Sequence, residues 1–522
     1  MSEQQSKSLV KSAAAVTVVL SVSKIVGFLR DVVLTQYFGT SSSADAYTQA
    51  FRVINIISST ISACVLATFI PMYTRIKNND GDEAAHRYTN NVLSAISLLS
   101  LVLILLCYLM MPTLIGLFSP GFSPDKRALT VQLARIMLPL ILTMAVMTFF
   151  QSYLNAHQRF FAAQLTGMPL SICVIGVVIV LQSTAGIFAS GYGTLLGGFL
   201  QVVVLLPFLR GIFRYQPIFQ PRDKHLLRTL MLMLPSLASV AINEVNSAVD
   251  AIMGSGLGEG AVASLSYSYK LINLVVGVVV VAVNAVIYTR LSNQNASGDS
   301  AGFRSTIRTG LMTQTALLAP IMVVAIIMGR EIITVVYQRG AFTAESTAMT
   351  TFAFVYYVPS ILFTALRDIM NRSFYSLGDT KIPALLGIVS VAANVIMNLA
   401  LIKVMNVGLL ALTFSLSLLV SAILLFYMLR KRLGPLGGRR LLKEGILILF
   451  CVAAQAAVML GIGVAAADMH PFIRLCIGAV GGLGAYGIMA FALNMQSAKF
   501  ALALFRRHAK KNRRKKIGGG LQ

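Results

Sequence analysis

Eleven charged side chains interrupt stretches of this sequence that are otherwise apolar and long enough to cross a membrane. A charge at the centre of a membrane helix costs about 2.5–3.5 kcal/mol on insertion scales, so such groups usually face a partner or a water-filled cavity. Seven are basic and four are acidic, and this positive excess favours an anionic substrate. The alternative is ion pairing between helices, which we expect for Arg135 and for Arg367 with Asp368. The eleven are Lys24, Arg30, Asp31, Arg52, Arg135, Glu244, Asp250, Lys270, Arg367, Asp368 and Arg372.

Three of these charges lie close together in the first apolar stretch. Lys24 and Asp31 are seven residues apart and therefore share a helix face, and Arg30 lies about a third of a turn away. Two cations beside one anion form a candidate site for an anionic ligand.

A second polar row lies in the seventh apolar stretch, where Asn243, Asn246 and Asp250 share one helix face. Oxygen ligands in such a row suit a hard cation such as sodium. Hydrogen bonding between helices is the alternative, and it is the one that we favour.

No catalytic motif accompanies these charges. The sequence contains no Walker loop, HExxH or GxSxG motif, which argues against an ATP-driven pump and against familiar hydrolases. The five cysteines are scattered singly, without CxxC or a ligand-like spacing to the five histidines. We therefore expect a protein that is not an enzyme and has no cofactor other than the candidate sodium ion.

The composition requires a membrane. Apolar residues make up 57% of the 522 residues and charged residues 12%, whereas soluble domains have about 45–50% and about 25%. Because about 20 apolar residues cross the hydrocarbon core, we predict an all-α polytopic membrane protein with about fourteen transmembrane helices. The predicted spans are 14–37, 46–73, 89–116, 130–155, 161–182, 191–209, 230–253, 263–288, 310–329, 345–377, 383–402, 409–428, 445–465 and 475–496.

The net charge of +25 is explained mainly by orientation. If the N-terminus is cytoplasmic, thirty of the 43 Lys and Arg residues lie in cytoplasmic segments and six in outer segments, as the positive-inside rule requires. Both ends are then cytoplasmic. The basic tail, 499–522, suits the anionic lipids of the inner leaflet, and we prefer this interpretation to nucleic-acid binding.

The two halves of the chain resemble each other in the same order. One match places Arg52 opposite Lys270. Repeated six-span units enter the membrane in the same direction, which is a transporter architecture. We predict an N-terminal lobe (1–220), a C-terminal lobe (221–435), an appended helix pair (436–498) and a tail (499–522). The matching segments are 46–57 with 265–275, 73–75 with 288–290, and 117–122 with 336–342.

These residues also resemble a known family. The pattern Lys24-x-x-Gly27-x-x-Arg30-Asp31, followed by residues 38–40 and 44–47, is similar to the first-helix signature of the MurJ (MviN) family of lipid II flippases. That family belongs to the multidrug/oligosaccharidyl-lipid/polysaccharide exporter superfamily. The similarity extends over nearly the whole chain and includes 374–383, between the tenth and eleventh spans. In the family, the final helix pair helps to form a groove for the lipid tail.

The resemblance implies a role for individual residues. Basic side chains of the cavity, Lys24, Arg30 and Lys270, would bind the pyrophosphate of the undecaprenyl-linked disaccharide-pentapeptide, with Asp31 in the same cluster. Asp45 falls on an outer gate acid, and Asp250 on a position where some members bind sodium. Lys24 and Lys270 replace arginines of the family, and Ser58 replaces a further one, for which Arg52 is the candidate substitute.

We therefore expect a monomeric flippase of the bacterial cytoplasmic membrane that moves lipid II outward by alternating access, without a nucleic-acid partner. Three alternatives stay open. The chain could export another polyprenyl-linked oligosaccharide, or a drug, although a cationic drug would require an acidic cavity. It could also be a membrane scaffold that transports nothing, which would tolerate neutral cavity residues.

Overall fold

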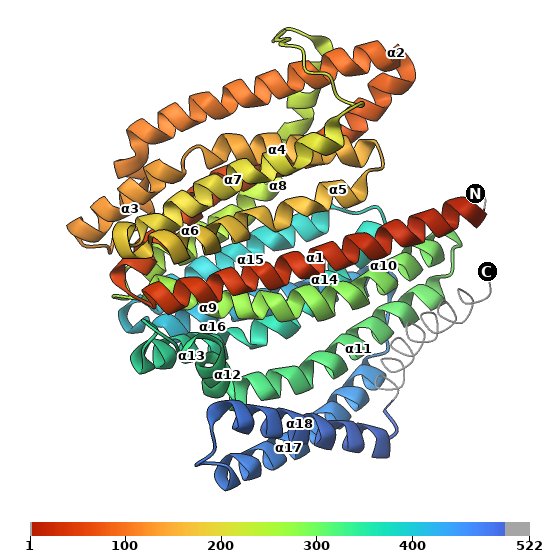
Figure 1. Ribbon diagram of the computed structural model, residues 1–522. Helices are drawn as coiled ribbons and strands as arrows, with labels where there is room; N and C mark the ends of the chain where they lie inside the picture. Colours follow the sequence, from red (N-terminus) through yellow and green to blue (C-terminus); the bar gives the residue numbers. More distant parts are fainter. Residues whose placement is uncertain (1–2, 496–522) are drawn as a thin grey trace, which may run out of the picture. The chain divides into compact units, whose positions relative to one another are not determined.

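The computed structural model describes residues 3–495, and this part of the chain contains helices and no strand (Figure 1). Helices begin where polar residues or proline interrupt the apolar runs. Ser41, Ser123 and Asp223 each accept backbone N–H groups from the first turn of the following helix, which satisfies donors that a helix end leaves unpaired. Proline opens the last described helix at Pro471, where no N–H is needed. The predicted all-α fold class is confirmed.

Helices of the first half are α1 (Glu3–Phe38), α2 (Ser42–Phe118), α3 (Pro124–Met137), α4 (Leu140–Ala156), α5 (Phe160–Gln164), the 3-10 turn η1 (Leu165–Gly167), α6 (Pro169–Ala185), α7 (Phe188–Leu209) and α8 (Lys224–Ser255). Those that follow are α9 (Ala261–Val275), the π-helical turn η2 (Val276–Val280), α10 (Val281–Ala296), α11 (Ser300–Ile327), α12 (Gly329–Tyr337), α13 (Ala344–Tyr357) and α14 (Pro359–Ser376). The last are α15 (Lys381–Ala400), η3 (Ile402–Val404), α16 (Val407–Leu433), α17 (Gly438–Ala465) and α18 (Pro471–Ala492).

Eleven helical segments of the described chain are long and apolar enough to cross a membrane. The chain is therefore an integral membrane protein. The number of fourteen spans stays a prediction. Two of the predicted spans, 46–73 and 89–116, lie within the single segment α2, and two others, 14–37 and 230–253, fall in α1 and α8, which are not among the eleven.

Helix α2 has 77 residues but is broken at Gly81. The backbone of Gly81 has φ 88° and ψ 175°, a region that only glycine adopts readily. This break divides α2 into a proximal arm, residues 42–80, and a distal arm, residues 82–118. The two predicted spans of α2 lie on separate arms, so the glycine supplies the reversal between them.

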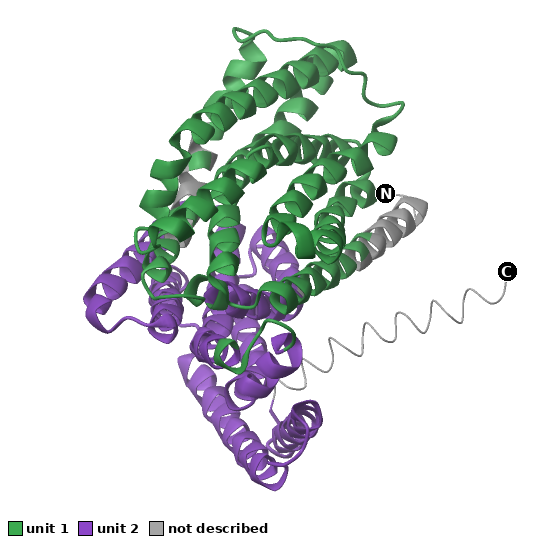
Figure 2. Ribbon diagram, turned by 60° about the vertical axis from the view of Figure 1, so that its left-hand side comes forward, with its two compact units in different colours: residues 1–264, 339–346 green, residues 265–338, 347–522 purple. Residues whose placement is uncertain are grey.

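The chain forms two compact units, which Figure 2 shows in separate colours. Unit 1 comprises residues 1–264 together with 339–346, and unit 2 comprises 265–338 and 347–522. The short segment 339–346, from the second half of the sequence, thus belongs to unit 1. The two units are defined by contacts within the structure, whereas the predicted lobes were defined by the sequence repeat. The lobe boundaries therefore stay a prediction. The predicted basic tail, 499–522, lies outside the described residues.

An aromatic cluster joins α2 and α4 inside unit 1. The ring of Phe69 lies 4.9 Å from that of Phe149 and 5.7 Å from that of Tyr73, and Tyr153 lies 5.6 Å from Tyr73. Two of these pairs are edge-to-face and the pair of Phe69 with Tyr73 is stacked, and such pairs contribute about 0.5–1.5 kcal/mol each beyond their burial. The Tyr153 hydroxyl donates to the carbonyl of Ile212 at 2.6 Å, so the cluster also holds the segment that follows α7.

In unit 2, a proline in α11 creates the attachment point for the final helix pair. Pro320 has no N–H, so it leaves the carbonyl of Ala316, four residues earlier, without its helical partner. The hydroxyl of Tyr486 on α18 donates to that carbonyl at 2.9 Å. Gln455 on α17 donates to the carbonyl of Pro320, also at 2.9 Å. Both bonds are buried, where an unpaired polar group is costly.

The connection between α14 and α15 is held by one carboxylate. Asp379 accepts the backbone N–H groups of Lys381 at 3.0 Å and Ile382 at 3.2 Å, and pairs with Arg432 at 2.5 Å. These donors, with the N–H of Ile382 foremost, hold the pKa of Asp379 below its ordinary value. The folded protein therefore stabilises the charged carboxylate of Asp379 relative to the unfolded chain.

We predict that Tyr486→Phe lowers the free energy of unfolding by about 1–3 kcal/mol, because it leaves the buried carbonyl of Ala316 unpaired. Thermal unfolding of the purified protein in detergent measures the loss. Tyr427→Phe is the matched control, because Tyr427 is 59% exposed on α16. Equal midpoints for the two variants would contradict the attachment.

We predict that Asp379→Asn is destabilising at neutral pH and that its effect disappears in acid. The lowered pKa makes the stabilisation complete above the ordinary carboxyl pKa of about 3.9 and removes it as the pH falls through the folded value. The measurement is the unfolding midpoint of both proteins from pH 7 down to pH 3, over which the difference should narrow. The exposed Asp468→Asn is the control, and a difference that does not narrow in acid would refute the linkage.

Candidate functional site

Two of the predicted cavity charges meet on α1. The Arg30 guanidinium donates from Nη2 at 3.1 Å and from Nε at 3.3 Å, both to Oδ1 of Asp31. The two side chains are 18% and 7% exposed. A hydrogen bond to a charged group is worth about 1.5–3 kcal/mol, and two of them to one oxygen fix the plane of the guanidinium. Arg30 is thus held in place while part of it stays accessible.

The other predicted cavity residues lie on separate elements. In unit 1, Lys24 is exposed on α1, and Arg52 is half-buried on α2. Lys270 is half-buried on α9 in unit 2, with its ammonium 5.5 Å from the ring centre of Tyr267. An aromatic face at this distance attracts a cation without neutralising it. The structure thus brings together Arg30 and Asp31, while Lys270 belongs to the other unit.

Position 58 carries no cation and has a structural role here. Ser58 is fully buried, and its hydroxyl donates to the carbonyl of Ile54 at 2.9 Å. The hydroxyl is thus satisfied within its own helix. That Arg52 supplies the positive charge that the family has at position 58 stays a prediction.

The predicted sodium site is only partly visible. Asp250 is half-buried on α8, but the side chains of Asn243 and Asn246 lie outside the described residues. Among the residues that the structure describes, no group of three or more His, Cys, Asp or Glu side chains is arranged to hold a metal ion. Amide and backbone oxygens can also bind sodium, so sodium at Asp250 stays a prediction.

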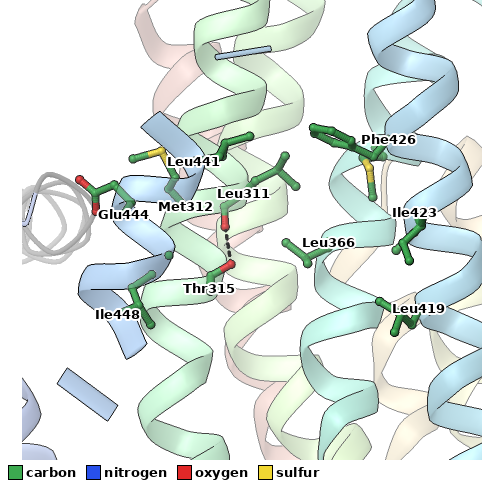
Figure 3. A pocket seen from close by; sticks show the side chains of 13 residues that line it. Leu311, Met312, Thr315, Leu366, Leu419, Ile423, Phe426, Leu441, Glu444 and Ile448 are labelled. Atoms are coloured by element: carbon green, nitrogen blue, oxygen red, sulfur yellow. Dashed lines mark hydrogen bonds between the residues drawn. The ribbon is translucent and has the colours of Figure 1, made fainter. Parts of the chain in front are cut away.

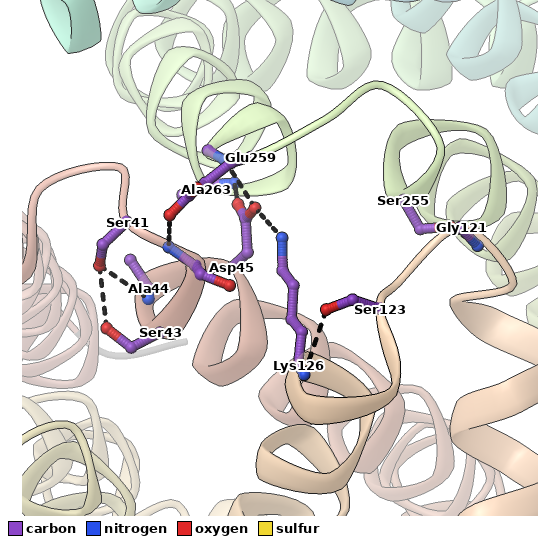
Figure 4. A network of polar contacts seen from close by, with 12 residues as sticks. Ser41, Ser43, Ala44, Asp45, Gly121, Ser123, Lys126, Ser255, Glu259 and Ala263 are labelled. Atoms are coloured by element: carbon purple, nitrogen blue, oxygen red, sulfur yellow. Dashed lines mark hydrogen bonds and ion pairs between the residues drawn. The ribbon is translucent and has the colours of Figure 1, made fainter.

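Asp45, the predicted gate acid, is the centre of a buried network in unit 1 (Figure 4). Its side chain is fully buried and pairs with the ammonium of Lys126 at 2.5 Å. The backbone N–H groups of Gly260 and Ala263 donate to its two carboxylate oxygens, each at 2.7 Å. Because Gly260 and Ala263 open α9, the carboxylate also caps that helix and favours its positive end.

Neighbouring contacts strengthen this network from both sides. Glu259 accepts the N–H of Ser42 at 2.8 Å, and Ser255 accepts the N–H of Gly121 at 3.3 Å. The ammonium of Lys126 also lies 4.2 Å from the ring centre of Phe122. We call this set, Ser42, Asp45, Gly121, Lys126, Ser255, Glu259, Gly260 and Ala263, the Asp45 closure. It fastens the start of α2 and the start of α3 to the turn between α8 and α9.

The segment 339–346 adds a further layer to the same end of unit 1. The N–H of Ala341 donates to the carbonyl of Gln36 at the end of α1, at 2.8 Å. Gly39 and Gly340 have φ of 54° and 58°, and a β-carbon on either would collide with the facing backbone. The close approach of the two segments therefore depends on glycine at both positions.

Sequence reasoning missed Lys126 as a partner of Asp45, because the pattern of charges along a chain does not show which loops meet. The signal available in the sequence was Asp45 itself, an acid directly before an apolar run, since an acid that becomes buried needs a partner. Arg135 was expected to form an ion pair, but this is wrong: it lies 4.6 Å from the ring centre of Tyr108 and donates to the carbonyl of Tyr108 at 3.5 Å.

Arg367 and Asp368 also make no ion pair within the described part of the chain. Their charges still interact at longer range, because they are adjacent on α14.

Unit 2 contains an apolar cavity of about 340 Å³ beside the appended helix α17 (Figure 3). Its walls come from α11, α14, α16 and α17, with Leu311, Leu366, Phe426 and Ile448 among the lining residues. Glu444 lies at its edge and is 7% exposed. A volume of this size is typical of ligand pockets. The groove for a lipid tail at the final helix pair stays a prediction, and this cavity is the apolar space that the structure shows beside α17.

Comparison with known proteins gives consistent matches. A family model described as "Lipid II flippase MurJ" matches residues 34–475. The "Probable lipid II flippase MurJ" of Thermotoga maritima is 26% identical over 437 residues, which cover 84% of this chain and 88% of that protein. The protein of the same name from Rhizobium tropici is 28% identical over 440 residues, or 81% of each chain.

Solved structures show the same fold. A structure titled "Lipid II flippase MurJ, inward closed conformation" superimposes with a TM-score of 0.79 at 23% identity and covers 92% of this chain and 99% of that one. An inward-facing multidrug resistance MATE transporter of the MOP superfamily gives 0.65 at 17% identity, over 81% and 98%. The resemblance to the MurJ family is thus confirmed over most of the sequence. Since the family model matches 34–475, this chain belongs to the lipid II flippase MurJ family.

Proposed function

We propose that this protein is a lipid II flippase of the bacterial cytoplasmic membrane and moves its substrate from the inner to the outer leaflet by alternating access. Its membership of the family carries this proposal, because the family model matches 34–475 and curated relatives of similar length carry that name. A protein of this family is a transporter and not an enzyme. The function therefore rests on binding, release and the movement of a gate.

Pyrophosphate binding is assigned to the basic residues of the cavity. Arg30 is the strongest candidate, because Asp31 holds its guanidinium while 18% of the side chain stays exposed. A guanidinium fits two phosphate oxygens at once, whereas the ammonium groups of Lys24 and Lys270 act as point charges. The ring of Tyr267 lies 5.5 Å from the ammonium of Lys270 and helps to position it. Arg52 would supply additional positive charge.

The Asp45 closure is proposed as the outer gate. With both termini cytoplasmic, the turn between α8 and α9 and the turn before α3 both lie on the outer side. The ion pair between Asp45 and Lys126, at 2.5 Å, would then close this side and leave the substrate to enter from the cytoplasm. Opening requires the removal of two backbone donors and one ammonium from a single carboxylate.

The membrane potential can drive the loaded step. Outward movement of an anion from a negative interior is favourable by about 2.3 kcal/mol per charge and 100 mV. A sodium ion at Asp250 would help to return the empty carrier, and the basic tail, 499–522, would bind anionic lipids of the inner leaflet. Both are proposals that follow from charge and position.

We predict that Arg30→Ala lowers flipping by about 10- to 100-fold, the equivalent of 1.5–3 kcal/mol for a charged hydrogen bond. The native host is depleted of its own protein, each variant is expressed, and the lipid II accessible from outside is measured. Lys403→Ala removes an exposed charge and serves as the control. Normal outer-leaflet lipid II in the triple variant Lys24→Ala/Arg30→Ala/Lys270→Ala would refute the proposal.

We predict that Asp45→Asn loosens the proposed gate, because it leaves the ammonium of Lys126 buried without a counter-charge, at a cost of about 3–5 kcal/mol. Hydrogen exchange of the full-length protein in detergent should accelerate more than tenfold at 254–263. Asp125→Asn is the control: it changes an exposed acid that is the second residue of α3, next to Lys126, and it should have no effect. Equal exchange in the two variants would show that the closure does not depend on the carboxylate.

A further inference from the structure

An apolar cavity of about 540 Å³ lies in unit 1 between the two arms of α2 and the first turns of α8. Ile61 of the proximal arm, Ala95 of the distal arm and Leu230 of α8 are among its lining residues. Leu98 and Leu99, at its rim, are 46% and 49% exposed. In a membrane-spanning segment, exposed leucines face lipid, so the cavity opens toward hydrocarbon.

A polar cavity of about 350 Å³ adjoins the apolar one. The distal arm of α2, the connection between α7 and α8 (residues 210–223) and α8 line both cavities. In each segment, successive residues line the polar and the apolar cavity: 91 and 92 on α2, 220 and 221 in the connection, and 225 and 226 on α8. Tyr88, on the polar side, hydrogen-bonds to Thr229, on the apolar side, at 2.9 Å. The two cavities lie on either side of this hydrogen bond, and we call them together the amphiphilic cleft, with a charged end and an apolar end.

The charged end is rigidly built. Asn91 accepts the backbone N–H of Gln220 at 2.8 Å and donates to the carbonyl of the same residue at 3.1 Å. Asn90 does the same for the preceding part of the connection, through the N–H of Gln216 and the carbonyl of Arg214. Both asparagines are buried. The wall of the cleft is thus fixed by paired hydrogen bonds between the asparagine side chains and the backbone of residues 214–220.

The charges at this end are mixed in sign. Carboxylates come from Asp80, Glu83 and Asp223, and cations from Arg87 and Lys224. Glu83 pairs with Arg87 at 2.6 Å, and Asp223 caps α8 through the N–H groups of His225 and Leu226. His225 adds a group that can carry a positive charge, 3.7 Å from Asp80. The sum is close to neutral, so a simple anion gains little here. A ligand that carries a phosphate and an ammonium group together can satisfy both signs.

We propose that this cleft binds one glycerophospholipid with a phosphoethanolamine headgroup. The headgroup occupies the polar cavity, where Lys224 contacts the phosphate and the carboxylate of Asp80 contacts the ammonium, with the Glu83–Arg87 ion pair beside it. One acyl chain occupies the apolar cavity between the arms of α2 and α8. This lipid is separate from the substrate.

Native mass spectrometry of the full-length protein tests this proposal. The delipidated protein is titrated with phosphatidylethanolamine or with phosphatidylglycerol of identical chains. One bound phosphatidylethanolamine is expected, with at least fivefold preference over phosphatidylglycerol. Equal retention of the two lipids would overturn the headgroup assignment.

Two sets of variants locate the site. Ala95→Leu adds bulk inside the apolar cavity and should reduce phosphatidylethanolamine binding by fivefold or more, whereas Leu105→Phe adds bulk to a 61%-exposed position of the same arm and should not. The double variant Asp80→Asn/Glu83→Gln leaves the cations in excess and should invert the preference toward phosphatidylglycerol. Thermal unfolding confirms that each variant is folded. Unchanged binding in a folded Ala95→Leu protein, or an unchanged preference in the double variant, would refute the site.

Discussion

One buried carboxylate holds together the end of unit 1 where four parts of the chain converge. Asp45 is fully buried and has three donors, the ammonium of Lys126 and the N–H groups of Gly260 and Ala263. Such a charge is tolerated in a medium of low dielectric only if every partner is present, because the loss of one leaves an uncompensated charge. The same requirement makes a partly formed closure costly, and this property suits the proposed outer gate.

The local backbone is shaped to allow this contact. Glycine at 39 and 340 lets the end of α1 and the segment 339–346 approach within hydrogen-bond distance. Few large side chains take part in the closure, so its stability depends on polar bonds more than on apolar burial. Polar bonds can be exchanged for bonds to water when the segments separate, whereas a packed apolar core cannot. This composition favours reversible opening over permanent closure.

Much of this could be predicted from the sequence, because membrane helices are encoded locally. Runs of about 20 apolar residues give the fold class, and a helical period of 3.6 places Lys24 and Asp31 on one face. Contacts between distant segments are not encoded in this way. The pairing of Asp45 with Lys126, 81 residues apart, depends on how the loops converge. The break at Gly81 was not identified either, since a single glycine in a polar stretch is consistent with any turn.

The attachment of α17 and α18 shows the same limit and its physical origin. Pro320 frees a carbonyl on α11, and Tyr486 of α18 pairs with it at 2.9 Å. A proline in a membrane helix is visible in the sequence, and so is a tyrosine in a later apolar run, but nothing local relates the two. What connects them is the rule that a backbone group in hydrocarbon must be satisfied. A buried polar residue in an apolar helix therefore indicates that another helix has an unpaired backbone group nearby. Which backbone group it is becomes known only from the fold.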